Sequence, residues 1–255
     1  MQAYVSRLKM LAASLAIVVL SASGALSDQV KVAVAANFTE AAKEIAAAFN
    51  ADTGHEAVLS FGSTGQLYTQ ITQGAPFEVF LAADTALPEK TVEEGFGVQG
   101  SAFTYAIGKI VLWSVNPDLV TGEQTLQTAR FDKIAIANPG TAPYGTAAIQ
   151  AMSALNVYDS LQPKIVQGAN IAQAYQFVKT GNAELGFVAL SQIAANTEGS
   201  RWIVSDDLYD PIRQDAVLLK TGRDNPAAEA FLSFLKSAAA VALIEKYGYS
   251  ADKTE

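Results

Sequence analysis

Residues 30–49 read VKVAVAANFTEAAKEIAAAF, and this stretch decides the fold class. Residues 30–35 are rich in valine and alternate in a way that is typical of a buried strand. Phe38, Ala41, Ala42, Ile45 and Phe49 then recur at the spacing of one helical face. A strand followed at once by a helix is the repeating unit of α/β proteins, in which helices join parallel strands.

The same unit recurs through the rest of the chain. We predict strands at residues 30–35, 57–61, 79–82, 110–115, 134–137, 164–166, 185–189 and 216–219, with helices between them. This alternation indicates parallel α/β sheets that are covered by helices on both faces.

The order of these segments favours two lobes over one large domain. The first three strand–helix units end near residue 101, and the apolar stretch 103–115 is long enough to cross to a second sheet. A second set of units runs to about residue 210, after which 215–219 returns to the first lobe before the closing helices. We therefore predict lobe 1 from residues 28–105 plus 216–255 and lobe 2 from residues 106–215.

The first 27 residues differ from the rest of the chain. Arg7 and Lys9 precede an apolar run, 10–20, which the small residues of 21–27 follow. This order is typical of a cleaved secretory signal peptide, and the run is about half the ~20 residues that a membrane-spanning helix needs. Because the sequence has no cysteine, a lipid-modified cysteine is excluded. We expect a monomer in the periplasm with no membrane anchor.

The composition indicates a globular protein and excludes two classes of partner. Half of the 255 residues are hydrophobic and only 16% are charged, which is unlike a disordered chain. Without Arg7 and Lys9, 15 basic and 25 acidic residues leave a net charge of −10. Nucleic acid and anionic lipid surfaces are therefore poor partners.

The side chains that enzymes use most often are scarce. The chain has no cysteine and one histidine, so a cysteine nucleophile and a His/Cys metal cluster are both impossible. That histidine, His55, begins the second predicted strand, whereas ligands of open α/β sheets lie beyond the carboxyl ends of strands. The segment 61–65, FGSTG, lacks the G-x-S-x-G order of a nucleophile elbow. We expect no enzyme activity, no cofactor and no direct metal-ion ligands.

Four strand-to-helix turns that are rich in small polar residues form the candidate site. They are 35–39 (AANFT), 62–65 (GSTG), 138–145 (NPGTAPYG) and 168–171 (GANI). Each turn begins a helix, and a helix N-terminus carries unpaired N–H groups and the positive end of the helix dipole. Several such ends that converge on one cleft would bind an anion without any charged side chain.

Each of these residues also has a purely structural interpretation. Asn37, Ser63, Thr64 and Asn170 are common helix N-caps, and Glu40 completes a capping pattern with Asn37. Tyr144 fits a packed aromatic residue whose hydroxyl reaches solvent. For any one residue the cap interpretation is favoured, so the hypothesis of a site rests on the four turns together.

At these turns the sequence resembles the periplasmic molybdate-binding proteins of ABC importers, within the type II periplasmic binding-protein fold. The matching stretches span nearly all of the predicted mature chain in the family's order. They are Ala35-Ala36-Asn37-Phe38, Ser60-Phe61-Gly62-Ser63-Thr64-Gly65, Gly74-Ala75-Pro76, Ala82-Ala83-Asp84, Ala142-Pro143-Tyr144-Gly145, Leu185-Gly186-Phe187-Val188-Ala189 and Tyr247-Gly248-Tyr249.

The resemblance implies two lobes, each a mixed, mostly parallel sheet flanked by helices, with molybdate or tungstate bound in the cleft between them. The implied ligand-binding residues are Ala36, Asn37, Ser63, Thr64, Tyr144 and Ile171. The implied partner is an ABC permease with its ATPase. Two positions depart from the family, because many members have serine at the position of Asn37 and tyrosine at that of Ala189.

The ligand class has alternatives. A pocket of donors suits an ion with four acceptor oxygens, such as molybdate or sulfate, whereas hydrogen phosphate brings a proton that needs an acceptor. A binding protein for a small organic acid or amino acid would need a positioned arginine. The candidate arginines lie outside the four turns; they are Arg130, Arg201, Arg213 and Arg223. A secreted serine/threonine hydrolase is a third hypothesis.

Overall fold

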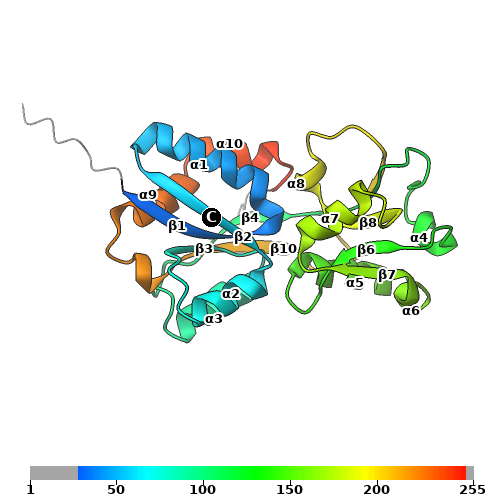
Figure 1. Ribbon diagram of the computed structural model, residues 1–255, viewed down its shortest axis with the longest axis horizontal. Helices are drawn as coiled ribbons and strands as arrows, with labels where there is room; N and C mark the ends of the chain where they lie inside the picture. Colours follow the sequence, from blue (N-terminus) through cyan, green and yellow to red (C-terminus); the bar gives the residue numbers. More distant parts are fainter. Residues whose placement is uncertain (1–27, 251–255) are drawn as a thin grey trace, which may run out of the picture.

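The computed structural model describes residues 28–250, so the predicted signal peptide, residues 1–27, lies outside the described residues. Within them the chain forms two five-stranded sheets that lie side by side along the long axis of the molecule (Figure 1). We call the sheet that contains β1, together with its helices, lobe 1, and the other sheet with its helices lobe 2.

Lobe 1 has a mixed sheet with the strand order β2-β1-β3-β10-β4, in which β10 runs antiparallel to both of its neighbours and the other pairs are parallel. Its strands are β1 (Gln29–Ala35), β2 (Glu56–Gly62), β3 (Val79–Leu81), β4 (Phe103–Gly108) and β10 (Ile212–Leu218). Its helices are η1 (Ala36–Phe38), α1 (Thr39–Thr53), α2 (Thr64–Thr72), α3 (Ala86–Glu93), η3 (Lys220–Gly222), α9 (Pro226–Leu235) and α10 (Ala238–Lys246). Helices α1, α9 and α10 cover one face of the sheet, and α2 and α3 cover the other (Figure 1).

Lobe 2 has the strand order β7-β6-β8-β5-β9, in which β6 is parallel to β7 and β8 while β5 is antiparallel to β8 and β9. Its strands are β5 (Ile110–Ser114), β6 (Ile134–Ala137), β7 (Ile165–Gly168), β8 (Leu185–Ala189) and β9 (Ser200–Ile203). Its helices are α4 (Gln124–Thr128), α5 (Pro143–Ala154), α6 (Tyr158–Leu161), η2 (Gln162–Lys164), α7 (Ile171–Lys179) and α8 (Leu190–Ile193). Helices α5 and α7 lie on opposite faces of this sheet (Figure 1).

The apolar face predicted for the first helix is the face that the structure buries. Phe38, Ala41, Ala42, Ile45 and Phe49 are all at most 1% exposed. The Phe49 ring meets that of Phe231 in α9 edge-on, with 5.3 Å between ring centroids. Packing of α1 against α9 and the sheet therefore fixes the direction in which β1 enters η1.

All eight predicted strands are present, and two further strands were not predicted as separate elements. β4 lies within the apolar stretch that was expected to cross between lobes, and it ends at Gly108 before that crossing. β9 has only four residues at the edge of its sheet, and its Ile203 is 50% exposed. β10 begins four residues earlier than predicted, because Gln214 and Asp215 are polar but buried in the strand.

The chain passes between the lobes at two places. Lys109 alone separates β4 of lobe 1 from β5 of lobe 2, and residues 204–211 lead back from β9 to β10. The boundaries predicted at 105/106 and 215/216 fall inside β4 and β10. Both strands hydrogen-bond to each other along their length, so both crossings lie at the same end of the lobe 1 sheet.

In residues 28–250, no single helix has the length and apolar character that crossing a membrane requires. Helices α9 and α10 meet the criterion of length and composition only when taken together, and they are bent by 61° relative to each other.

Candidate functional site

The four predicted turns converge on one cavity between the lobes. Each follows the carboxyl end of a parallel strand: β1 leads into η1 and β2 into α2 from lobe 1, while β6 leads into α5 and β7 into α7 from lobe 2. The cavity is lined by Ala35, Ala36, Asn37, Ser63, Thr64, Ala83, Ala142, Pro143, Tyr144, Asn170 and Ile171. The structure therefore brings all six predicted ligand-binding residues together, although they are up to 135 positions apart in the sequence.

The cavity is small and closed. Its volume of about 10 Å³ is roughly the room that a single bound water needs. Beside it, the Gly65 N–H of lobe 1 donates to the Thr141 carbonyl of lobe 2 at 2.9 Å. A side chain at Gly65 would press on the Thr141 backbone, because its Cβ would lie 3.1 Å from Thr141 Cα. The lobes are thus in contact, and the enclosed space admits one small species.

Hydrogen-bond donors without partners face this space. Four backbone N–H groups donate to no acceptor among the described residues; they belong to Asn37, Thr64, Tyr144 and Ile171. The Ser63 hydroxyl is buried and makes no hydrogen bond within the same part of the chain. Buried polar groups are nearly always paired, so these groups are available to donate to a species bound between the lobes.

The cavity favours a negative charge although none of its lining residues is charged. Helices α2, α5 and α7 begin at the cavity, and each directs the positive end of its dipole there. Thr64 Oγ1 accepts a hydrogen bond from the Ala83 N–H at 3.0 Å, which leaves its own hydrogen free to donate. The arrangement provides several neutral donors for one enclosed anion.

The interpretation of these residues as helix caps holds for one of them. Asn170 caps α7, since its Oδ1 accepts from the Gln173 N–H at 3.0 Å. Ser63 stands at the N-cap position of α2, but its hydroxyl does not cap. Asn37 lies inside η1, and the Glu40 carboxylate pairs with Lys43 instead of completing a capping box. The cap interpretation is therefore wrong for Asn37. Ser63 is the N-cap residue of α2, with its N–H bonded to Gln66 Oε1 at 3.3 Å, but its hydroxyl makes no bond among the described residues.

The Asn37 side chain joins a buried polar network instead. Its Nδ2 donates to Gln214 Oε1 at 2.8 Å and to the Tyr249 hydroxyl at 3.0 Å, and it lies 3.4 Å from the Tyr144 hydroxyl. Its Oδ1 accepts no hydrogen bond from the described residues. Gln214 Nε2 donates to the Tyr144 hydroxyl at 3.1 Å. The sequence had indicated neither Gln214 nor any contact of Tyr249 with the site.

The Tyr144 side chain is not the solvent-facing aromatic of the structural interpretation. The residue is 2% exposed, and its hydroxyl reaches from α5 into this network. Burial raises the pKa of Tyr144 and of Tyr249 well above the usual value, so both hydroxyls stay protonated. Tyr144 therefore offers the cavity its backbone N–H and offers the network its hydroxyl.

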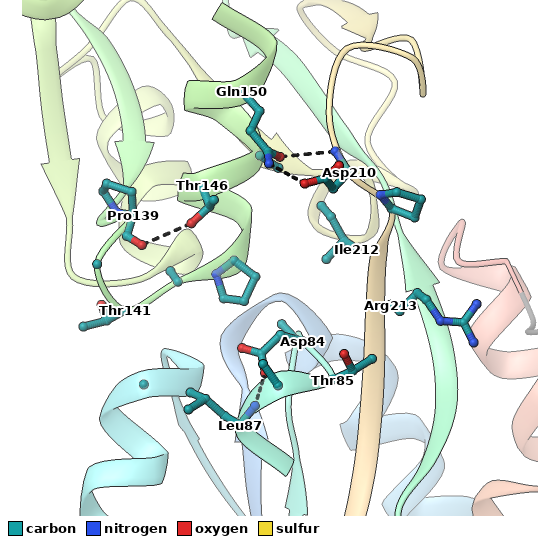
Figure 2. Close-up of a pocket in the computed structure, with 18 residues that line it drawn as sticks. Asp84, Thr85, Leu87, Pro139, Thr141, Thr146, Gln150, Asp210, Ile212 and Arg213 are labelled. Atoms are coloured by element: carbon teal, nitrogen blue, oxygen red, sulfur yellow. Dashed lines mark hydrogen bonds between the residues drawn. The ribbon is translucent and has the colours of Figure 1, made fainter. Parts of the chain in front are cut away.

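A wider groove of about 380 Å³ opens between the lobes beside the closed cavity (Figure 2). Asp84 and Leu87 of lobe 1 face Thr146 and Gln150 of α5 across it, and Gln150 is hydrogen-bonded to Asp210. Burial, and to a lesser extent the charge of Asp215, raises the pKa of Asp84 to about 6, although the Leu87 N–H opposes this by donating to its Oδ1 at 2.8 Å.

His55 lies away from both spaces. It immediately precedes β2, its Nδ1 accepts from the Asp28 N–H at 3.3 Å, and its ring stacks on Phe49. Among residues 28–250, no group of three or more His, Cys, Asp or Glu side chains is arranged to hold a metal ion.

Two lobes joined by two crossings, with a donor-lined cavity closed between them, define a two-lobed binding protein for a small anion. The chain belongs to the family of bacterial extracellular solute-binding proteins, whose sequence profile matches residues 30–250. The family is one of binding proteins, and this confirms the prediction that the chain is not an enzyme.

Relatives of known identity resemble the chain along most of its length. It is 55% identical over 238 residues to the molybdate-binding protein ModA of Rhodobacter capsulatus, covering 93% of this chain and 94% of that protein. It is also 55% identical over 234 residues to ModA of Azotobacter vinelandii, covering 90% and 93%. The solved periplasmic molybdate-binding protein of Azotobacter vinelandii superposes with a TM-score of 0.84 at 44% identity, covering 87% of this chain and 98% of that chain. The predicted two-lobed fold is thereby confirmed.

Proposed function

We propose that this protein captures molybdate or tungstate outside the cytoplasm and delivers it to an ABC importer. The observation that carries the proposal is the closed cavity, which is lined by unpaired donors and by no charged residue. The relatives at 55% identity are molybdate-binding proteins, and this supports molybdate over other ions of the same shape.

The geometry favours a tetrahedral oxyanion over an organic acid or amino acid. A cavity of about 10 Å³ suits one compact species and lacks the length that the carbon skeleton of an organic acid or amino acid needs. No arginine lines the cavity: Arg201 donates to the Ile193 carbonyl, and Arg213, which lines the wider groove, donates to Thr104 Oγ1 at 3.2 Å. A carboxylate would therefore lack the bidentate partner that usually binds it.

Each ligand-binding residue has a distinct role in this proposal. Thr64 and Ser63 donate through their hydroxyls, and the backbone N–H groups of Asn37, Thr64, Tyr144 and Ile171 donate along their helix axes. Ala36 packs at the wall and keeps η1 close to the ion.

The Asn37 amide can supply a further donor. An amide is nearly symmetric in shape, so a half-turn about its last bond exchanges Nδ2 and Oδ1. The Gln214 amide, whose Oε1 accepts from Nδ2 at 2.8 Å, must turn as well, so that its Nε2 donates to Asn37 Oδ1 and its Oε1 accepts from the Tyr144 hydroxyl. The Tyr249 hydroxyl keeps its bond to the Asn37 carbonyl.

The cellular setting follows from the family and the leader. The family is extracellular, and the signal-like residues 1–27 support export to the periplasm. The partner is an ABC permease with its ATPase, which the closed, loaded form meets at the membrane. Without Arg7 and Lys9 the net charge is −10, which makes nucleic acid a poor partner.

A thermal-shift series at fixed pH tests the proposal. Micromolar molybdate and tungstate should raise the melting temperature, while equal sulfate, phosphate and amino acids change it little. A ligand at 100 times its dissociation constant stabilises a protein by about 2.7 kcal/mol, which such a scan resolves. A response to an amino acid, together with none to molybdate or tungstate, would replace the oxyanion by an organic ligand.

A further inference from the structure

We propose that Ser191, Gln214 and Tyr249 are positioning residues that hold Asn37 against the oxyanion only when the two lobes are closed. The inference rests on the proposed function and adds to it a set of residues that do not line the cavity. Together with Asn37 and Tyr144, we call them the closure network.

Asn37 is held from two directions. Its backbone carbonyl accepts from the Ser191 hydroxyl and from the Tyr249 hydroxyl, each at 2.8 Å. Its side-chain amide contacts Gln214 and Tyr249 at 2.8 and 3.0 Å. Fixing both the carbonyl and the side chain of one residue also fixes its backbone dihedrals, and with them the direction of its N–H. A network outside the cavity thus sets the geometry of a donor inside it.

The network joins the two lobes. Asn37, Gln214 and Tyr249 pack with lobe 1, whereas Tyr144 begins α5 and Ser191 lies in α8 of lobe 2. The bonds from Ser191 to Asn37 and from Gln214 to Tyr144 therefore cross the interface. When the lobes separate, both bonds must break, so the complete network exists only in the closed form.

The residues of this network are closely packed and have little room to move. Asn37, Gln214, Ser191 and Tyr249 are at most 7% exposed. At Gly108, where β4 ends before the crossing to β5, a Cβ atom would overlap the Tyr144 hydroxyl and approach Gln214 Nε2 to 2.6 Å. Gly108 leaves the space that Tyr144 needs to reach lobe 1. Interior groups so tightly packed move between discrete arrangements and do not deform continuously.

Two pairs of matched variants test the proposal by titration calorimetry with molybdate. Ser191→Ala removes a hydroxyl that bonds across the lobes, and its control Ser160→Ala removes one that bonds only to Val157 within α6 and its preceding turn. Tyr249→Phe removes the hydroxyl at Asn37, and its control Tyr247→Phe removes one that bonds Glu44 at 2.7 Å on the surface of lobe 1.

Ser191→Ala and Tyr249→Phe should each weaken molybdate binding about tenfold, mainly through faster dissociation, while both controls bind within about twofold of the parent. Without ligand, Ser191→Ala and its control should have similar melting temperatures, because the bonds of the Ser191 hydroxyl cross the lobes and are broken when the lobes open. Tyr249→Phe also removes bonds within lobe 1, so its melting temperature should fall, and its affinity is measured well below that temperature. The double variant should lose less than the two single losses combined, since both hydroxyls serve one carbonyl. A purely structural role would lower the melting temperature and leave the affinity unchanged.

The outcomes separate this inference from the proposed function. If the parent binds molybdate and both network variants bind it as tightly as their controls, the positioning role is refuted and the function stands. If the parent binds neither molybdate nor tungstate, both fall. If Tyr249→Phe does not fold, Ser191→Ala decides, because its hydroxyl contributes to no contact within lobe 2 that the structure records.

Discussion

Replacing Ser63 by alanine gives opposite results for its two possible roles. Its hydroxyl stands at the N-cap position of α2, where a serine usually bonds a backbone N–H. Here the hydroxyl is buried and unpaired, and it faces the cavity. If it serves as a cap, Ser63→Ala costs stability and spares binding. If it serves the ligand, the same change spares stability and costs binding.

The structure sets the size of each effect. A hydrogen bond to a charged group contributes about 1.5–3 kcal/mol, so losing it should weaken oxyanion binding by roughly 10- to 150-fold. Without ligand, alanine removes a hydroxyl that is left unpaired on closure, and the melting temperature should stay the same or rise slightly. The Ser63 N–H still bonds Gln66 Oε1 at 3.3 Å, so the start of α2 keeps that support.

Calorimetric titration with molybdate and thermal unfolding without it measure the two effects in parallel. Ser237→Ala is the matched control, because Ser237 caps α10 with an oxygen that accepts from the Ala240 N–H at 3.2 Å. The control should lose about 1 kcal/mol of stability and no affinity. A Ser63→Ala variant that loses stability as the control does, and still binds molybdate as tightly as the parent, refutes the reasoning.

Two further predictions concern groups on either side of the cavity. Asn37→Asp should weaken molybdate binding by on the order of a thousandfold at pH 8, because a carboxylate cannot donate and repels a dianion. At ~4 Å and an effective dielectric near 20, each charge pair costs about 4 kcal/mol, so the two charges of the ion cost about 8. Half of that cost is enough for the thousandfold loss. Asn37→Ser should lose much less, and equal affinity of parent and aspartate variant by calorimetry would remove the side chain from the site. The second concerns Asp84, whose pKa rises from 3.8 to about 6 on folding, so the folded state binds the proton more tightly and stability falls as pH rises from about 4 to 6. Asp84→Asn should therefore be more stable than the parent at pH 7.5, by up to about 3 kcal/mol, and equal to it below pH 4 in urea unfolding; a less stable variant at pH 7.5 would contradict this.

The parts of the site that local sequence determines were predictable. A valine-rich strand, a small polar turn and an amphipathic helix lie within 20 residues at 30–49, and the same order recurs at the other three turns. Since parallel strands end at one edge of a sheet, the turns had to meet if the lobes faced each other. Pattern and topology together therefore placed the four turns at one cavity, and the resemblance to the family singled out Asn37, Ser63, Tyr144 and Ile171 within them.

The closure network was not predictable in the same way. Asn37 meets Ser191, Gln214 and Tyr249 across 154, 177 and 212 positions of sequence. Gln214 sits inside a strand, where a lone polar residue gives no sign of whether it faces solvent or a buried partner. The terminal segment Tyr247-Gly248-Tyr249 matched the family, but the sequence does not distinguish the Tyr249 hydroxyl at the site from the Tyr247 hydroxyl at Glu44. Such contacts depend on how the lobes pack.

Selection between molybdate and sulfate is then a question of lobe separation. Both are dianions with four acceptor oxygens, so the neutral donors of this cavity cannot distinguish them by charge or by hydrogen-bond pattern. The surface charge of the protein cannot distinguish the two ions either, since exposed charges are screened over ~8 Å at physiological ionic strength. The property that remains to distinguish them is the size of the ion. An ion that is too small leaves donors of one lobe unpaired when the Ser191 and Tyr144 bonds form, and one that is too large keeps those bonds from forming. Because these bonds are buried, they tie the stability of the closed form to one spacing of the lobes, and that spacing selects the ion.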